Sequence, residues 1–269
     1  MNSTVILILA AIVLTIAAFL LLSKRPADRS STPVARSTHA APSGFAPRVS
    51  LSIQDTPDTP QSFGYKMAWF AIPTDDSAKI ITVLGLKDAI RANWASGVSA
   101  VYSDISHVFV TPPVEGWTLV LGLGLPSFDT PERTREFLAF IDKLAASFPA
   151  FCYFGTHRVV EFQGWVKVAN GKIERAYAYL GERGETLYES GKKSPEEIAL
   201  GFAFFDERLP EAASPGYYER KDLRFPEEED VMKIAAIWTI NTQTLNKRTE
   251  KGTGYLTKLS QGPTNGLSR

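Results

Sequence analysis

Residues 150–180 read AFCYFGTHRVVEFQGWVKVANGKIERAYAYL. This stretch predicts a strand, a tight bend and a β-hairpin, because β-branched and aromatic side chains lie on both sides of Asn170-Gly171. Asn-Gly favours the two-residue type I′ turn, in which both central residues adopt φ > 0. That turn sets an expected register in which opposite charges meet and a glycine leaves room for a tyrosine ring. The expected pairs are Val168 with Ile173, Lys167 with Glu174, Val166 with Arg175, Trp165 with Ala176, Gly164 with Tyr177, and Phe162 with Tyr179.

The segments around this hairpin predict an α+β fold. Thr74 and Thr130-Pro131 are typical starts of helices, and the second precedes an apolar stripe at helical spacing. Up to residue 156 the predicted order is strand, helix, strand, strand, helix, strand, as in a ferredoxin-like βαββαβ antiparallel sheet. We expect helices on one face, with a C-terminal β-hairpin and short helices extending the sheet. The expected segments are strands at 67–72, 107–111, 117–123 and 150–156, helices at 74–85 and 130–148, and a less regular segment with core contacts at Ile90, Trp94, Val98 and Tyr102.

The composition limits the class of protein. The chain has 269 residues, 44% of them hydrophobic, which is enough for one sizeable core or two small ones. Its formal net charge is zero, so no overall field attracts nucleic acid, and no nucleic-acid partner is predicted. The single cysteine, Cys152, rules out an intrachain disulfide. With three histidines and no metal-ligand spacing, the sequence predicts no metal site and no cofactor.

Residues 5–22 predict a transmembrane anchor. In this run only Thr15 is polar, and as a helix it spans roughly 27 Å, close to the thickness of a bilayer's hydrocarbon core. No basic residue precedes the run and no small-residue cleavage site follows it, which distinguishes it from a secretory signal peptide. Lys24, Arg25 and Arg29 follow it, so the positive-inside rule favours the cytoplasm over the periplasm for the rest of the chain. We expect a single-pass protein of the bacterial inner membrane, anchored by residues 1–23.

Composition then divides the remainder into three parts. Ser, Thr, Pro and Ala make up 23 of the 41 residues from 23 to 63, so residues 24–63 are expected to form a disordered tether. Residues 64–245 carry the periodic apolar patterns and are expected to form a single α+β domain. Residues 246–269 are polar and basic without periodicity, and we expect a disordered tail.

Residues 182–230 are acidic, with fourteen Asp or Glu against seven Lys or Arg, a net charge of −7. Part of this acidity is structural, because Ser194-Pro195-Glu196-Glu197 reads as a capping box. The carboxylates that follow Pro226 also favour the start of a helix through its macrodipole. The segment as a whole offers negative charge to a basic protein partner. The predicted binding residues are Glu182, Glu185, Glu189, Glu196, Glu197, Glu227, Glu228 and Glu229.

Two groups of residues are candidates for catalysis. Cys152 and His157 could form a thiol nucleophile with its base, but their odd spacing on a strand places them on opposite faces, which favours a buried, inert cysteine. His157, Arg158 and Glu161 could form an acid–base pair with an anion clamp. They could also be an exposed strand end that carries an Arg–Glu ion pair, and we favour this second interpretation.

Two runs of sequence resemble a motif set of known proteins. They are residues 153–159, YFGTHRV, and residues 175–185, RAYAYLGERGE. The set resembles that of an uncharacterised bacterial family associated with immunity proteins against contact-delivered toxins, including type VI secretion effectors. The resemblance covers about residues 64–245. It implies binding to a toxin and transfers no catalytic residue to this chain.

Together these observations favour a membrane-tethered, non-enzymatic binding protein that neutralises a bacterial toxin, whose basic domain would be the protein partner. The first alternative is a membrane-associated hydrolase using His157, Arg158 and Glu161, which requires these side chains to converge in one pocket. The second alternative is a structural component of an envelope complex, with the tether as a spacer.

Overall fold

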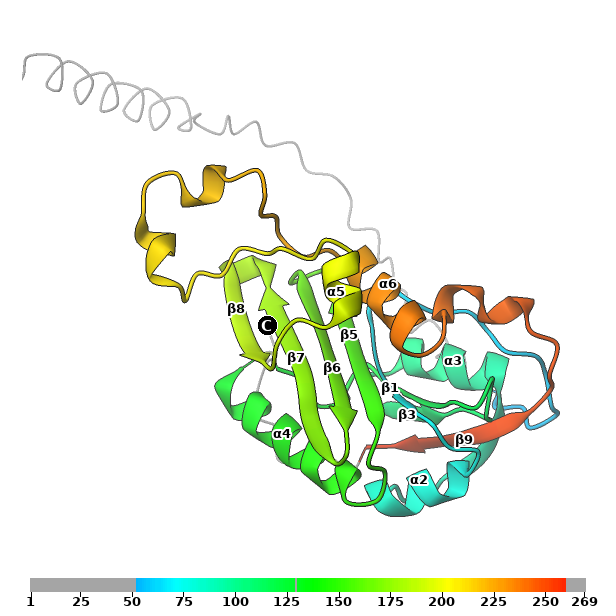
Figure 1. Ribbon diagram of the computed structural model, residues 1–269. Helices are drawn as coiled ribbons and strands as arrows, with labels where there is room; N and C mark the ends of the chain where they lie inside the picture. The colour runs from blue at the N-terminus through cyan, green and yellow to red at the C-terminus, as the bar shows by residue number, and fades with distance from the viewer. Residues whose placement is uncertain (1–51, 129, 260–269) are drawn as a thin grey trace, which may run out of the picture. The chain divides into compact units, whose positions relative to one another are not determined.

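A mixed α+β architecture is built around one nine-stranded antiparallel sheet (Figure 1). The computed structural model describes residues 52–128 and 130–259. The strand order across the sheet is β2-β9-β3-β4-β1-β5-β6-β7-β8. The strands are β1 (Met67–Ile72), β2 (Ile90–Asn93), β3 (His107–Val110), β4 (Thr118–Leu121), β5 (Phe151–His157), β6 (Phe162–Ala169), β7 (Lys172–Leu180), β8 (Glu185–Ser190) and β9 (Thr253–Lys258).

Helices cover both faces of the sheet, so the expectation of helices on one face is wrong. The central strands, β1 and β3 to β7, alternate their side chains between two apolar cores, as the period of two requires. One core joins the sheet to α2 (Ser77–Leu84) and α4 (Pro131–Ala145), through Ile80 and Phe137 among others. The other joins it to α3 (Trp94–Ser103) and α6 (Glu228–Trp238), with Leu200 after α5 (Pro195–Ala199) packed against it. The short 3-10 helices are η1 (Gly181–Arg183), η2 (Pro210–Ala213), η3 (Tyr217–Glu219) and η4 (Thr242–Lys247).

The predicted helix starts are largely confirmed. Thr130 caps α4, where its Oγ1 accepts a hydrogen bond of 3.2 Å from the Arg133 backbone N–H. Ser194 and Glu197 form the expected capping box of α5, and Glu227 caps α6. The first helix starts later than Thr74, because Asp76 is its N-cap. Sequence reasoning missed α3, because this segment was expected to be irregular. Of the core contacts expected in that segment, Ile90 and Tyr102 are instead 52% and 41% exposed.

The central hairpin forms at Asn170-Gly171, and both residues have positive φ, as predicted. The predicted register holds only next to the turn, where Val168 pairs with Ile173. A β-bulge between Lys167 and Val168 shifts every later pair by one residue. The observed partners are therefore Lys167 with Arg175, Val166 with Ala176, Trp165 with Tyr177, Gly164 with Ala178, and Phe162 with Leu180. Lys167 still reaches Glu174, at 4.0 Å.

The expected tail from residue 246 is wrong for the part that the structure describes. Strand β9 lies inside the sheet and pairs with both β2 and β3. Leu256 is 3% exposed and belongs to the core. The pairing partners of β9 lie about 150 residues earlier in the chain, so no local sequence pattern marks it.

The expected tether also ends earlier than residue 63. Residues 52–63 pack on the domain: Phe63 is 5% exposed, and the Asn93 N–H donates to the Gln54 carbonyl at 2.7 Å. The Asp58 carboxylate accepts hydrogen bonds from the backbone N–H groups of Trp94 and Ala95, at 2.6 and 2.9 Å. Asp58 thereby satisfies N–H donors at the start of α3 that lack partners within the helix.

The expected α+β class is confirmed, but the ferredoxin-like order is not confirmed for this larger sheet. Strands β2 and β9 flank β3 on one side, and β6, β7 and β8 continue the sheet beyond β5 on the other. Among residues 52–128 and 130–259, no helix has the length and apolar character needed to cross a membrane. The predicted anchor at residues 5–22 lies outside the described residues.

Candidate functional site

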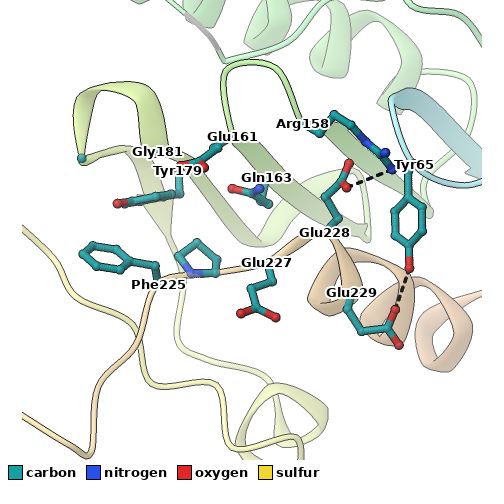
Figure 2. Close-up of a pocket in the computed structure, with 12 residues that line it drawn as sticks. Tyr65, Arg158, Glu161, Gln163, Tyr179, Gly181, Phe225, Glu227, Glu228 and Glu229 are labelled. Carbon is teal, nitrogen blue, oxygen red and sulfur yellow. Dashed lines mark hydrogen bonds and ion pairs between the residues drawn. The ribbon is translucent and has the colours of Figure 1, made fainter.

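A cavity of about 640 Å³ lies at one end of strands β5, β6 and β7, beside the start of α6 (Figure 2). This size is within the range of protein ligand sites. We call it the acidic cavity, because four glutamates and one arginine line it. Its lining residues are Tyr65, Arg158, Glu161, Gln163, Tyr179, Gly181, Gly184, Phe225, Pro226, Glu227, Glu228 and Glu229.

The floor of the acidic cavity is formed by Gln163 and Tyr179, and Thr156 lies next to Gln163 in the same row across the sheet. Thr156 pairs with Gln163, and Gln163 pairs with Tyr179, so all three point to the same face. Gln163 is 4% exposed, and its Oε1 is buried without a hydrogen-bond partner in the described structure. A buried carbonyl oxygen in this state costs about 1–3 kcal/mol. An unpartnered acceptor therefore lies at the floor of the acidic cavity.

One wall of the cavity is the first turn of α6 and the residue before it. The Thr156 hydroxyl donates to Glu228 Oε1 at 2.8 Å, and Arg158 Nη2 lies 3.4 Å from Glu228 Oε2. The Tyr65 hydroxyl donates to Glu229 Oε2 at 2.9 Å (Figure 2). The sequence positions carboxylates here because negative charge stabilises a helix N-terminus. The fold then turns the same charge toward the cavity.

The opposite wall carries Glu161 in a strained conformation. Its φ of +53° lies in the left-handed region, which is unfavourable for a residue with a Cβ. The turn is held by the Gly181 N–H, which donates to the Glu161 carbonyl at 3.0 Å. Only glycine fits at 181, since a Cβ there would lie 2.3 Å from Glu161 Oε2. The result places the Glu161 carboxylate beside Tyr179 in the cavity (Figure 2).

The phenols of the cavity are held neutral. Burial raises the pKa of Tyr179 well above its ordinary value, and the negative charges of Glu207 and Glu161 add to the effect. The pKa of Tyr65 is raised mainly by its hydrogen bond to Glu229. Both rings remain uncharged at neutral pH, so the charge of the cavity comes from its glutamates and Arg158.

The predicted binding glutamates lie in different environments in the structure. Glu227, Glu228 and Glu229 come together in the lining of the acidic cavity. Glu197 is 1% exposed and bound to Arg175, so it cannot serve as a surface contact, and that prediction is wrong. The other four lie outside the cavity lining: Glu189 in ion pairs with Arg175 and Arg208, Glu196 within 3.4 Å of Trp238 Nε1, and Glu182 and Glu185 exposed on η1 and β8.

The three side chains of the hypothetical catalytic group, His157, Arg158 and Glu161, do not line one common cavity. Arg158 and Glu161 line the acidic cavity, whereas His157 lines a separate cavity of about 230 Å³ with Tyr153. His157 is the last residue of β5, whereas Arg158 and Glu161 lie in the turn between β5 and β6, which separates their side chains. Cys152 is buried, and burial raises the pKa of its thiol to about 12, which makes it unreactive at neutral pH.

Sequence reasoning missed the uncharged residues of the site: Tyr65, Gln163, Tyr179 and Phe225. One signal was available, since Gln163 is a polar residue that shares a face of β6 with the aromatic Trp165. Phe225 is 47% exposed, and Tyr218, 52% exposed, stacks near it at 6.5 Å. Both rings belong to the segment 206–225, yellow to orange in Figure 1, which extends away from the sheet.

The arrangement suits recognition of a positively charged group. Carboxylates, an unpaired amide oxygen and aromatic faces all attract cations or N–H donors. Among residues 52–128 and 130–259, no group of three or more His, Cys, Asp or Glu side chains is arranged to hold a metal ion. The chain matches no protein-family model, and no curated protein or solved structure matches it significantly.

Proposed function

We propose that this protein is a non-enzymatic binding protein whose acidic cavity receives a basic segment of a protein partner. The observation that carries the proposal is the lining of the cavity, in which Glu161, Glu227, Glu228 and Glu229 face a single arginine. The exposed rings of Tyr218 and Phe225 at its edge are of the kind that anchors protein interfaces. Electrostatic complementarity of this kind mainly supplies specificity and association rate.

We propose further that the partner is a bacterial toxin and that the chain is its immunity protein. This step rests on the resemblance of residues 153–159 and 175–185 to the immunity-associated motif set. The apolar run at residues 5–22 would hold the protein at the inner membrane, with the binding domain on the cytoplasmic side. An immunity protein at that place would meet a toxin as it enters the cell.

Binding to the products of the neighbouring genes tests the proposal. The full-length chain is compared with the Glu227→Gln/Glu229→Gln double variant by a quantitative binding measurement at low and high salt. The control is Glu136→Gln/Glu250→Gln, which removes the same charge from exposed positions outside both the cavity lining and the acidic segment 182–230. We expect the cavity variant to bind about tenfold more weakly and the control to bind as the parent does. Equal binding by all three proteins would refute the cavity as the binding site.

The cavity geometry and a second experiment, on cells that express a toxin, address the alternatives. A hydrolase using His157, Arg158 and Glu161 is not supported, because His157 lines a different cavity. A structural component of an envelope complex would bind its partners constitutively and would not protect cells that express a toxin. Protection of such cells, lost in the double variant, separates these roles.

For the architecture we propose that β3, β4, β1 and β5, with α2 and α4, form a ferredoxin-like unit at the centre of the larger sheet. The order of these four strands and their antiparallel pairing support this reading. Both helices pack on the same face of the sheet. The remaining strands would then be additions, and β6 and β7 among them supply Gln163 and Tyr179 to the cavity floor.

A further inference from the structure

The folded chain repeats one local arrangement at three places among its described residues. In each, a guanidinium lies over an aromatic ring and also contacts a carboxylate. The distances from the guanidinium carbon to the ring centroid are 5.4 Å for Arg158 over Tyr65, 5.8 Å for Arg175 over Tyr177, and 5.1 Å for Arg224 over Phe204. The corresponding carboxylate contacts are Glu228 at 3.4 Å, Glu197 at 3.0 Å and Asp230 at 2.6 Å.

The acidic cavity presents the same two components on its inner surface. The rings of Tyr179 and Phe225 lie 5.9 Å apart with an angle of 38° between their planes. The carboxylate of Glu161 lies beside Tyr179, whereas that of Glu227 lies farther from the rings, at the start of α6 (Figure 2). Neither carboxylate forms an ion pair within the described part of the chain, in contrast to Glu228, which is paired with Arg158. The Glu161 carboxylate and the ring pair therefore lie together in the cavity, and Glu227 adds negative charge from the α6 side.

Gln163 provides an observation that does not depend on the acidic cluster. Its Oε1 is buried without a partner on the cavity floor, next to Tyr179. A carbonyl oxygen can only accept a hydrogen bond, so it selects for a ligand that donates. This oxygen adds an uncharged acceptor to the carboxylates of the cavity. A ligand with several N–H groups in fixed directions would satisfy them all.

We propose that the acidic cavity binds the guanidinium group of an arginine side chain in the protein partner. This inference rests on the proposed function and specifies the basic residue that the cavity recognises. A guanidinium is planar, stacks on aromatic faces, and carries five N–H donors in a rigid fork. An ammonium is a compact, strongly hydrated charge, which gains less from a ring pair and from acceptors spread around a plane.

The test uses three synthetic peptides that differ only at three positions, occupied by arginine, lysine or the uncharged analogue citrulline. Their binding to the full-length chain is measured by fluorescence anisotropy. We expect the arginine peptide to bind about tenfold more tightly than the lysine peptide, and the citrulline peptide not to bind detectably. Phe225→Leu and Gln163→Leu should each reduce the ratio of arginine to lysine affinity. The control Tyr255→Leu removes a ring that lies under Arg91, outside the cavity lining, and should leave this ratio unchanged.

The outcomes separate this inference from the proposed function. Equal affinity for arginine and lysine peptides, with both weakened by Glu227→Gln/Glu229→Gln, would refute guanidinium selectivity and leave the binding function intact. No binding of the arginine peptide at about 1 mM would also refute the inference, since even a weak specific contact reaches this range. The proposed function itself is tested separately, by the partner-binding measurement on the Glu227→Gln/Glu229→Gln variant.

Discussion

At the scale of single residues, Glu161 is a strained residue in the lining of the acidic cavity. Its φ of +53° costs roughly 1–2 kcal/mol relative to a glycine in the same conformation. The turn that imposes this conformation also brings the carboxylate next to Tyr179. Strained residues of this kind cluster at functional sites, where the surrounding structure holds them in place.

Replacing Glu161 by glycine should therefore stabilise the protein while weakening binding. We expect Glu161→Gly to raise the free energy of unfolding by about 0.5–1 kcal/mol, because relief of the left-handed strain exceeds the entropy that glycine gains in the unfolded chain. The same variant should bind the arginine peptide more weakly. Urea unfolding followed by circular dichroism measures the stability.

The matched control is Glu185→Gly on β8, an exposed strand residue that pairs with Leu180 and has no positive φ. There the same exchange should lower the free energy of unfolding by about 0.5–1 kcal/mol, since glycine weakens a strand. If both variants lose stability equally, Glu161 is not strained.

At the scale of elements, a buried ion pair joins α5 to the sheet. Arg175 on β7 and Glu197 on α5 are 2% and 1% exposed, and Arg175 Nε lies 3.0 Å from both oxygens of Glu197. Trp165 Nε1 donates to the same carboxylate at 3.0 Å, as does the Ser194 N–H at 2.7 Å. Every acceptor site is used, which is the condition for a buried pair to be tolerated.

Removing the charge of Glu197 should be strongly destabilising. Glu197→Gln leaves Arg175 buried without its main partner, and we expect the free energy of unfolding to fall by about 3 kcal/mol. Glu174→Gln removes the exposed partner of Lys167 at 4.0 Å and should change it by less than about 0.5 kcal/mol. Urea unfolding of both variants compares the pairs directly. Similar effects of the two substitutions would contradict the assigned role of the buried pair.

Strand β9 should be essential for folding, although composition alone marks its region as a tail. A chain that ends at residue 249 loses the only strand between β2 and β3, and their backbone groups lose their partners. We expect this truncated chain to be insoluble or to unfold without cooperativity. A chain that ends at residue 259 keeps β9 and should unfold as the full-length protein does. Cooperative unfolding of the shorter chain would contradict the assigned place of β9.

At the scale of the whole molecule, Cys152 should report global unfolding. The side chain is 5% exposed between strands of the central sheet, and the pKa of its thiol is about 12. Alkylation requires the thiolate, so labelling of the native protein at pH 8 must await an opening that exposes the sheet. We expect labelling by iodoacetamide to be at least about a thousandfold slower than in concentrated urea. Labelling at a similar rate in both states would indicate an exposed, activated thiol.

Predictions from the sequence succeeded where one segment contains all the information. Thr130 and Ser194 cap helices through their own neighbours, and Asn170-Gly171 adopts its turn from its local backbone preference. The predicted hairpin register is correct for Val168 and Ile173, next to the turn, and wrong from the following pair onward. A bulge at Lys167 replaced the simple pairing, and the contacts that favour it come from packing across the sheet.

The candidate site was predicted in part for the same reason. Glu227, Glu228 and Glu229 follow Pro226 in a pattern that starts a helix, so their presence as a cluster is local. Their approach to Tyr65 and Thr156, more than 70 residues earlier, depends on how α6 packs on the sheet. Gln163 could be recognised as an unusual polar residue, but its lack of a partner could not.

By itself, the sequence determined the α+β class, the helix starts, the hairpin turn and the excess of carboxylates in residues 182–230, because these follow from local backbone preference, side-chain period and charge. Only the tertiary structure decided that β9 lies between β2 and β3, that Glu197 is buried, and that His157 and Arg158 serve different cavities. These features arise from hydrogen bonds and packing between segments distant in the chain. Such contacts form because each buried polar group needs a partner and each apolar face needs cover, and the pattern of a single segment does not specify which distant segment provides them.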